Sequence, residues 1–223
     1  MKIISLFKKY AMIFEKHGYN LYMIGGTSRD YLLGIEPKDV DFTTDATPSE
    51  MSEFLNDLSM QFAKYGTVFF KDNGVKIEIT TLRTEKDYKD FRHPGEIIFV
   101  KNIEKDYSRR DFTINALYID KDLKIHDFAN GLEDLENRII RVIGDPKVRI
   151  KEDPLRILRA LRFSLVLDFE IEETLQKAII LCKNDLFLLN KDKTNFEIRQ
   201  MMKFDKNNTI RLLNEYDIPL TFK

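Results

Sequence analysis

The pattern of apolar residues changes near residue 145, and this change limits the folds that are open to the chain. Before it, alternating runs typical of strands mix with runs at helical spacing. After it, apolar residues recur only at helical spacing, which predicts helices at 154–166, 171–183, 194–204 and 207–215. We therefore predict an α+β domain with a mixed sheet and flanking helices over residues 1–146, followed by a small all-α domain over residues 147–223.

Capping and turn signals delimit the predicted elements of the first domain. In order, they are a helix at 1–17, a buried strand at 20–24, a short helix capped by Ser28, a strand at 39–43, and a helix at 47–59 that opens on a capping box. They continue with a hairpin of strands at 67–71 and 75–82, a loop at 83–95 that contains His93, a strand at 96–100, a helix after a second capping box that starts at Ser108, and strands at 116–119 and 123–128.

Two aspartates occupy alternate positions of one predicted strand. Because side chains alternate along a strand, Asp39 and Asp41 point to the same face while Val40 and Phe42 point to the other. Two carboxylates placed in this way can share divalent cations. Two aspartates at alternate positions of a strand edge are also common as surface residues that are simply exposed to solvent. The pair alone therefore does not distinguish a metal site from an ordinary polar surface.

Two neighbouring features favour phosphate chemistry at this pair. Gly25 and Gly26 follow a buried strand directly, where a glycine turn lets the backbone approach phosphates closely. Glu78 lies in the middle of a later predicted strand, on its polar face. Three acids on neighbouring strands can hold two metal ions that clamp the attacking and leaving oxygens of a phosphoryl displacement. Asp39, Asp41 and Glu78 are therefore the candidate catalytic residues.

Charge is distributed unevenly along the chain. The net charge of −1 argues against a protein that binds nucleic acid over its whole surface. Residues 138–162, however, include eight basic and three acidic residues, a local excess of five positive charges. This cluster suits a phosphate-rich ligand, although a solvated helix face would have the same composition.

Several classes of protein are disfavoured by the sequence. No apolar run approaches the roughly 20 residues that a membrane-spanning helix needs. The N-terminal stretch lacks a small-residue cleavage site, and the single cysteine, Cys182, cannot form an internal disulfide. The three histidines lie far apart, so no zinc-finger spacing is present. We expect a cytoplasmic protein.

Six ordered runs of the sequence resemble the signatures of one enzyme family. They lie between residues 24 and 163 and read IGGTSRDYLLGIEPKDVDFTTDATP, IEITTLR, YKDFRHP, RRDFTINALYID, DFANGLEDLENRIIRVIG and EDPLRILRALRF. The chain resembles the class II tRNA nucleotidyltransferases (CCA-adding enzymes) and bacterial poly(A) polymerases, a branch of the polymerase-β-like nucleotidyltransferase superfamily. The resemblance implies a catalytic head followed by a helical neck. It also implies template-independent addition of C and A to the 3′ end of tRNA from CTP and ATP, with Mg²⁺ as the cofactor.

The resemblance also implies a role for each matched residue. Asp39 and Asp41 would bind Mg²⁺ with assistance from Glu78. The residues that would bind the incoming nucleotide are Gly25, Gly26, Arg29, Arg110, Asp111, Asn115, Asp153, Arg156, Arg159 and Arg162. Among them, Asp153 and Arg156 would hydrogen-bond to the edge of the base.

The chemistry of Asp153 and Arg156 suits this implied selection. Cytosine and adenine each present an amine donor beside a ring-nitrogen acceptor, whereas uracil and guanine reverse that pattern. An aspartate accepts from the amine and an arginine donates to the ring nitrogen, so the two side chains can select C and A without a template. Without the upstream motifs, we would interpret Asp153 as a helix cap and the following arginines as a solvated stripe.

The resemblance leaves the extent of the activity open. Members of this family are usually much longer, with body and tail domains that grip tRNA, so the chain is a fragment, a minimal enzyme or one half of a split enzyme with a partner chain. It lacks the basic Gly-Arg-Arg-Phe-type stretch of the poly(A) polymerases, which favours tRNA, and the loop at 83–94 favours complete CCA addition. The alternatives are a CC-adding, A-adding or poly(A) polymerase-like enzyme, a nucleotide-binding subunit that needs a partner, and a nucleotidyltransferase acting on a small molecule or protein.

Overall fold

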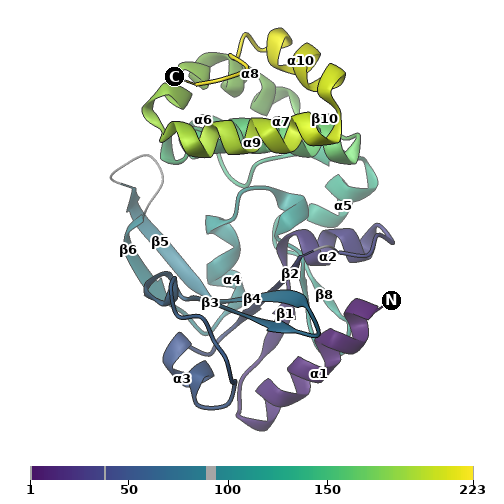
Figure 1. Cartoon of the computed structure of the whole chain (residues 1–223), viewed down its shortest axis with the longest axis vertical. Helices are drawn as coiled ribbons and strands as arrows, with labels where there is room; N and C mark the ends of the chain where they lie inside the picture. The colour runs from purple at the N-terminus through teal and green to yellow at the C-terminus, as the bar shows by residue number, and fades with distance from the viewer. Residues whose placement is uncertain (1, 38, 89–93, 223) are drawn as a thin grey trace. The chain divides into compact units, whose positions relative to one another are not determined.

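The computed structural model describes residues 2–37, 39–88 and 94–222. The chain divides into two compact units, which are described separately below. The sheet unit comprises Met1–Lys86, Glu96–Arg110 and Ile114–Leu132, and the helical unit comprises Asp87–Gly95, Asp111–Thr113 and Glu133–Lys223. Figure 1 shows strands and helices mixed in the first unit and mainly helices in the second, so the predicted α+β architecture is confirmed.

A six-stranded mixed sheet forms the centre of the sheet unit (Figure 1). Its strands lie in the order β3-β4-β2-β1-β7-β8, and β2 and β4 are parallel whereas the other pairs are antiparallel. The strands are β1 (Leu21–Met23), β2 (Val40–Thr44), β3 (Thr67–Asp72), β4 (Val75–Thr81), β7 (Tyr118–Ile119) and β8 (Ile125–His126). The parallel pair of β2 and β4 brings together two strands that are far apart in sequence.

One face of this sheet packs against helix α1 (Lys2–Lys16). Phe7 and Phe14 of the helix are fully buried, and the ring of Phe7 lies 5.4 Å from that of Phe42 on β2. Burying each such side chain contributes roughly 1.5–3 kcal/mol. Because side chains alternate along β2, the burial of Phe42 on this face leaves Asp41 on the opposite face of the sheet.

The hairpin between β3 and β4 matches its prediction closely. Asn73 and Gly74 form the two-residue turn, with φ of +50° and +81°. The tight primed turns that fit the twist of a hairpin require positive φ at both central residues, which Asn and Gly adopt readily. The turn therefore fixes the register in which the side chains of β3 and β4 face one another.

Two predicted helices of the sheet unit differ from those observed. Helix α2 (Gly25–Leu32) begins three residues before the predicted cap Ser28, whose hydroxyl donates instead to the carbonyl of Gly25 within the helix. Helix α3 (Pro48–Ser52) has the predicted capping box but ends at Ser52, well before residue 59. Asp57 has a φ of +57°, which a right-handed helix does not allow.

The predictions for residues 83–111 were wrong in two places. Residues 83–88 were predicted as loop, but Arg83–Tyr88 forms β5, which pairs with β6 (Pro94–Phe99) in a separate sheet. The strand is polar and has no apolar alternation to mark it. The second capping box is also absent, since the nearby helix is α4 (Ile103–Asp106), capped by Asn102. His93 lies outside the described residues.

The four helices predicted after residue 145 are confirmed, and one more precedes them. The helices are α6 (Pro146–Glu152), α7 (Leu155–Leu167), α8 (Glu173–Cys182), α9 (Lys191–Phe204) and α10 (Lys206–Glu215). The additional helix, α6, has Pro146 in its first turn and Asp145 as its cap.

Shorter elements complete the two units. They are α5 (Gly131–Glu136), the parallel strands β9 (Ile139–Ile140) and β10 (Glu170–Ile171), and the 3₁₀ turns Ala63–Tyr65, Tyr107–Arg109, Thr113–Asn115 and Lys183–Leu188. Of the helices that the structure describes, none combines the length and apolar character needed to span a bilayer.

Candidate active site

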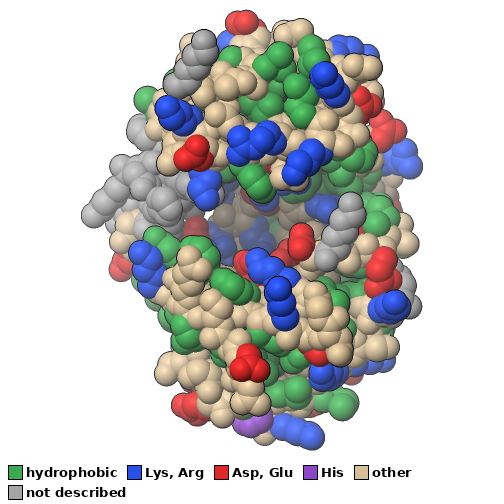
Figure 2. All heavy atoms as spheres, viewed as in Figure 1, with side chains coloured by type: hydrophobic (Ala, Val, Ile, Leu, Met, Phe, Trp, Pro, Cys, Tyr) green, Lys and Arg blue, Asp and Glu red, His purple; other side chains and the backbone are tan. Residues whose placement is uncertain are grey.

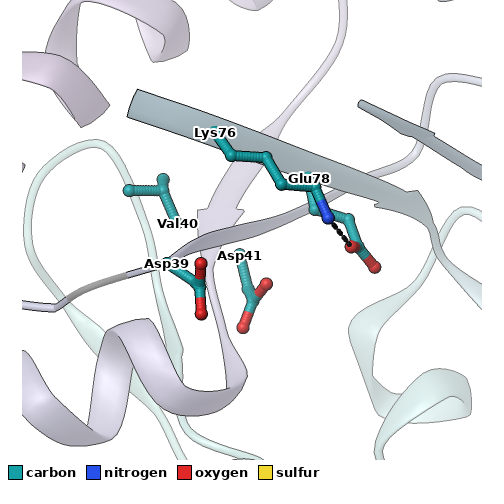
Figure 3. Close-up of a pocket in the computed structure, with 5 residues that line it drawn as sticks. All are labelled: Asp39, Val40, Asp41, Lys76 and Glu78. Atoms are coloured by element: carbon teal, nitrogen blue, oxygen red, sulfur yellow. Dashed lines mark ion pairs between the residues drawn. The ribbon is translucent and has the colours of Figure 1, made fainter. Parts of the chain in front are cut away.

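The candidate catalytic carboxylates lie on the face of the sheet opposite α1. Asp41 on β2 and Glu78 on β4 are register partners in the parallel pair, and Asp39 immediately precedes β2. Figure 3 shows Asp39 and Asp41 pointing to the same side, into a pocket of about 200 Å³ that Val40, Lys76 and Glu78 also line. The alternation predicted for the three acids therefore brings them into one pocket.

A buried threonine fixes the strand that carries the two aspartates. The hydroxyl of Thr27 in α2 accepts a hydrogen bond from the backbone N–H of Asp41 at 2.7 Å and donates to the backbone carbonyl of Asp39 at 3.2 Å. Thr27 is fully buried. One hydroxyl thus braces the backbone at both aspartates, a role that the sequence alone did not reveal.

The two glycines lie against the carboxylate of Asp41. Gly25 has a φ of +66°, which favours glycine, and a Cβ at this position would lie 3.5 Å from Asp41 Oδ2. A Cβ at Gly26 would lie 3.9 Å from the same oxygen and 3.6 Å from Arg29 Nη2. The turn from β1 into α2 therefore leaves bare backbone beside the carboxylate, as a phosphate-binding turn requires.

The charge of Asp41 is poorly compensated. Burial, together with the negative charges of Glu78 and Asp39, raises the pKa of Asp41 to about 6. The positive charges of Arg110 and Lys76 oppose this increase without cancelling it. A divalent cation bound at the pocket would remove the repulsion among the three carboxylates.

The donor set fits an ion that takes few protein ligands. Among the described residues, no three His, Cys, Asp or Glu side chains are arranged to hold one ion. Glu78 turns toward Lys76, whose Nζ lies 3.8 Å from Glu78 Oε2 (Figure 3). Magnesium is typically bound by one or two carboxylates and completes its octahedron with water and substrate phosphates, which suits Asp39 and Asp41.

Arg29 and Asn115 are hydrogen-bonded to each other beside the glycine turn. Arg29 is only 7% exposed, and its Nη1 donates to Asn115 Oδ1 at 2.9 Å. Its Nε and Nη2 donate to Asp30 Oδ1 at 2.9 and 2.6 Å. Two residues predicted to bind the nucleotide therefore form one buried network on the sheet unit, next to Gly26.

Arg110 belongs to a second buried network, which the sequence analysis missed. Its Nη2 lies 2.8 Å from Asp106 Oδ2, and the Tyr118 hydroxyl donates to the same oxygen at 2.6 Å. Burial favours the neutral acid, but the charges of Arg109 and Arg110 outweigh it and hold the pKa of Asp106 far below its usual range. The network fixes the guanidinium of Arg110 in a polar, ionised setting.

The remaining predicted residues belong to the helical unit. Asp111 accepts a hydrogen bond at 2.8 Å from Nε of Arg159, whose guanidinium lies over the ring of Phe163. Arg162 donates from Nε to Glu197 Oε2 at 2.6 Å. Glu197 lies in the middle of α9 and is buried.

Asp153 and Arg156 are both engaged at the start of α7. Asp153 follows the last residue of α6, and its Oδ1 accepts a hydrogen bond from the backbone N–H of Leu155, the first residue of α7, at 3.1 Å, while Pro154 is the residue at the cap position of α7. Arg156 is only 5% exposed and donates to the backbone carbonyl of Arg149. Both side chains are therefore held by local contacts with defined geometry.

The sheet unit, with paired aspartates on a central strand, a third acid on the adjacent parallel strand and a glycine turn against them, defines a polymerase-β-like nucleotidyltransferase head. The comparison with known families agrees with this class. Residues 21–141 match the Poly A polymerase head domain family, and the chain belongs to this family.

The chain is also similar to curated proteins named CCA-adding enzyme. It is 46% identical to that of Lactobacillus helveticus over 165 residues, which are 74% of this chain and 41% of the relative. It is 38% identical to that of Streptococcus suis over 204 residues, which are 90% of this chain and 51% of the relative. The chain thus spans about half the length of the curated relatives it matches.

Solved structures of CCA-adding enzymes share the fold. The crystal structure of the Bacillus stearothermophilus enzyme in complex with CTP is similar over 93% of this chain and 51% of that protein, with a TM-score of 0.85 and 32% identity. A CCA-adding enzyme in complex with ATP is similar over 97% of this chain and 51% of that protein, with a TM-score of 0.80 and 30% identity.

Proposed function

We propose that the chain adds C and A nucleotides, without a template, to the 3′ end of tRNA, using CTP and ATP and releasing pyrophosphate. The observation that carries the proposal is the pairing of Asp41 with Glu78 across two parallel strands, with Asp39 in the same pocket. The similarity to CCA-adding enzymes over most of this chain supports the choice of substrates.

The three carboxylates would bind the metal ion that the reaction needs. Asp39 and Asp41 would hold Mg²⁺, and Glu78 would assist them on the neighbouring strand. Bound there, Mg²⁺ supplies charge neutralisation at the triphosphate and lowers the pKa of the RNA 3′-hydroxyl. The hydroxyl oxygen would lose its proton to solvent and form a bond to the α-phosphorus of the nucleotide, while the bond from the α-phosphorus to the oxygen that bridges it to the β-phosphate breaks and pyrophosphate leaves.

The residues around the carboxylates would position the nucleotide. Gly25 and Gly26 would expose backbone to the triphosphate, and Arg29, Arg110, Asp111 and Asn115 would contact the triphosphate and ribose. The buried partners of Arg29 and Arg110 support this role, because groups that are already ordered lose little freedom when a ligand binds.

Asp153 and Arg156 would read the base, with Arg159 and Arg162 supporting nucleotide binding. Their fixed partners favour a rigid recognition surface, which base selection needs. On this account residues 1–146 perform catalysis and residues 147–223 recognise the nucleotide. A role in tRNA processing would place the protein in the cytoplasm.

A second proposal arises from the length of the relatives. Because the chain spans 41–51% of the curated relatives quoted above, a partner chain could supply the remaining contacts to tRNA. The chain would then bind nucleotides and act fully only with that partner. Addition of nucleotides to tRNA by the isolated chain would exclude this alternative.

An extension assay tests the proposal. The isolated chain is incubated with Mg²⁺, CTP, ATP and a tRNA that lacks its terminal CCA, and the products are resolved by length. Addition of three nucleotides in the order C, C, A supports the proposal, whereas addition of C alone, of one A or of a long A tract identifies one of the narrower alternatives. Transfer to a small molecule or protein, with no extension of tRNA, would contradict the proposal.

A further inference from the structure

Two lysines face each other across the β3–β4 hairpin. Lys71 and Lys76 are direct register partners, so their side chains leave the same face of the sheet. Both are exposed. Like charges directly opposite one another destabilise a strand pair. The hairpin therefore keeps an unfavourable pair at this position, in a chain whose net charge is −1.

The lysine pair adjoins the candidate catalytic acids. Lys76 is the residue two positions before Glu78 on β4 and lines the same pocket. Its Nζ lies 3.8 Å from Glu78 Oε2 and 5.0 Å from the centre of the Phe69 ring. Half of the Lys76 side chain is exposed, and an ion pair of this kind contributes little to stability. Figure 2 shows basic side chains next to acidic ones over β3 and β4.

The order of the strands places the lysines and the glycine turn on opposite sides of Asp41. Gly25 follows β1, on one side of β2, and its backbone lies against the Asp41 carboxylate. Glu78 and Lys76 lie on β4, on the other side of β2, and Lys71 lies one strand further out on β3. Asp41 thus lies between the neutral backbone of the glycine turn on one side and the two lysines on the other.

This strand order suggests opposite sides of Asp41 for the nucleotide triphosphate and for the attacking RNA 3′-hydroxyl. In phosphoryl transfer the attacking and leaving oxygens lie roughly in line through the phosphorus. If the departing pyrophosphate rests on the glycine turn, the attacking RNA strand arrives from the side of Glu78 and the lysines. The phosphate nearest the 3′-hydroxyl is then the negative group that meets the two cations.

We propose that Lys71 and Lys76 bind the phosphate backbone of the RNA 3′ end and hold the attacking hydroxyl beside Glu78. The inference rests on the proposed nucleotidyl transfer, since it requires a glycine turn occupied by the triphosphate. The triphosphate is the other source of phosphate at this site, and the strand order favours the RNA because the lysines lie on the side away from Gly25.

The test compares three double variants: one that removes both charges of the lysine pair, one that keeps both charges, and one that removes two lysine charges elsewhere as a control. The variants are Lys71→Met/Lys76→Met, Lys71→Arg/Lys76→Arg, and Lys8→Met/Lys16→Met, whose exposed lysines lie on α1 against the opposite face of the sheet. The probe is a dye-labelled tRNA acceptor hairpin without its CCA end. We measure its Kd at several KCl concentrations, and KM for the hairpin and for CTP.

The account predicts a selective loss of RNA binding in the neutralised pair. Kd and KM for the RNA hairpin should rise roughly 5- to 30-fold at low salt, while KM for CTP changes much less. The slope of log Kd against log salt should fall by about 1 to 2, because two phosphate contacts are lost. The arginine pair should restore hairpin binding, and the α1 pair should match the wild type.

Other outcomes overturn the inference. A rise in KM for CTP with unchanged hairpin binding would assign the lysines to the triphosphate, and equal hairpin binding by the neutralised pair and the wild type would leave them without a role. A lower melting temperature for the protein with the neutralised lysine pair would indicate a structural role, since removing like charges should not destabilise the β3–β4 strand pair. If the wild type binds the hairpin but adds no nucleotide, the proposed function fails while the Kd comparison still tests the lysines.

Discussion

Asp41 and Glu78, which are 37 positions apart in sequence, stand side by side as register partners of the parallel strands β2 and β4. The pKa of Asp41 rises to about 6 through burial and the negative charges of Glu78 and Asp39. The sheet therefore concentrates negative charge at one point. That concentration is unfavourable for the protein alone and favourable for binding a cation.

Replacing Asp41→Asn should stabilise the metal-free protein while removing its activity. A carboxyl whose folded-state pKa is raised destabilises the fold as the pH rises above its unfolded value of about 3.9, and does so fully above a pH of about 6, so near pH 8 the variant should gain up to about 3 kcal/mol. Thermal unfolding in EDTA measures this gain, with the exposed Asp122→Asn as the control. Adding Mg²⁺ should raise the melting temperature of the wild type more than that of the variant. A variant less stable than the wild type in EDTA would contradict this account of the pocket.

The two glycines should respond differently to alanine. Gly25→Ala places a side chain at a φ of +66°, which should cost roughly 1–2 kcal/mol of unfolding free energy. Gly26 has no positive φ and lies within α2, so Gly26→Ala should leave stability equal or slightly higher. Urea unfolding compares the two variants. Equal destabilisation by both would show that crowding at Asp41, and not backbone conformation, sets the requirement.

Asp106→Asn should destabilise the protein strongly and flatten its response to acid. Removing the charge takes away the buried carboxylate that pairs with both Arg109 and Arg110, which should cost roughly 3–5 kcal/mol. The folded-state pKa of Asp106 is depressed, so its contribution is complete above the unfolded value of about 3.9 and is lost as the pH falls below it.

Urea unfolding between pH 3 and pH 7 checks this prediction. The wild type should lose stability toward pH 3 more steeply than Asp106→Asn. Asp122→Asn, at an exposed position, should follow the wild type within about 0.5 kcal/mol. A variant that retained wild-type stability at pH 7 would show that the network does not hold Arg110 in place.

Asp153→Asn should relax the choice of nucleotide without unfolding the helix. Asparagine caps helices about as well as aspartate, so the bond to the N–H of Leu155 should survive. The amide no longer offers a charged acceptor to the amine of cytosine or adenine, so the preference for C and A over U and G should fall roughly 10-fold. Incorporation of each of the four nucleotides measures it.

A matched control exists at the start of α6, where Asp145 accepts from the backbone N–H of Val148 at 2.8 Å. Asp145→Asn makes the same chemical change at a helix cap that we assign no role in recognition. Both variants should have wild-type melting temperatures. An unchanged preference among the four nucleotides in Asp153→Asn would refute base reading by this residue.

Features set by neighbouring residues could be predicted from the sequence. Alternation placed Asp39 and Asp41 on one face, and the Asn73-Gly74 turn set the hairpin that carries Glu78. Both follow from backbone geometry within a few residues. The structure therefore agrees with the sequence for the carboxylates and for the strands that bear them.

Contacts between distant segments could not be predicted. The hydroxyl of Thr27 reaches Asp41 on another element, and the Tyr118 hydroxyl reaches Asp106 across a gap of 12 positions. Such partners depend on how elements pack, which no local pattern encodes. Strand β5 was missed for a related reason, since its polar side chains pair with one another, as Arg83 does with Glu85.

The central claim is that Asp39 and Asp41 support metal-dependent transfer of a nucleotide to RNA. Its most direct test is the single-turnover rate of labelled CTP incorporation into tRNA that lacks its CCA end, in Mg²⁺, for the wild type, Asp39→Ala/Asp41→Ala and the exposed control Glu53→Ala/Asp122→Ala. We predict that the first variant loses at least about 100-fold in rate while the control keeps the wild-type rate. Incorporation by Asp39→Ala/Asp41→Ala at the wild-type rate would contradict the account.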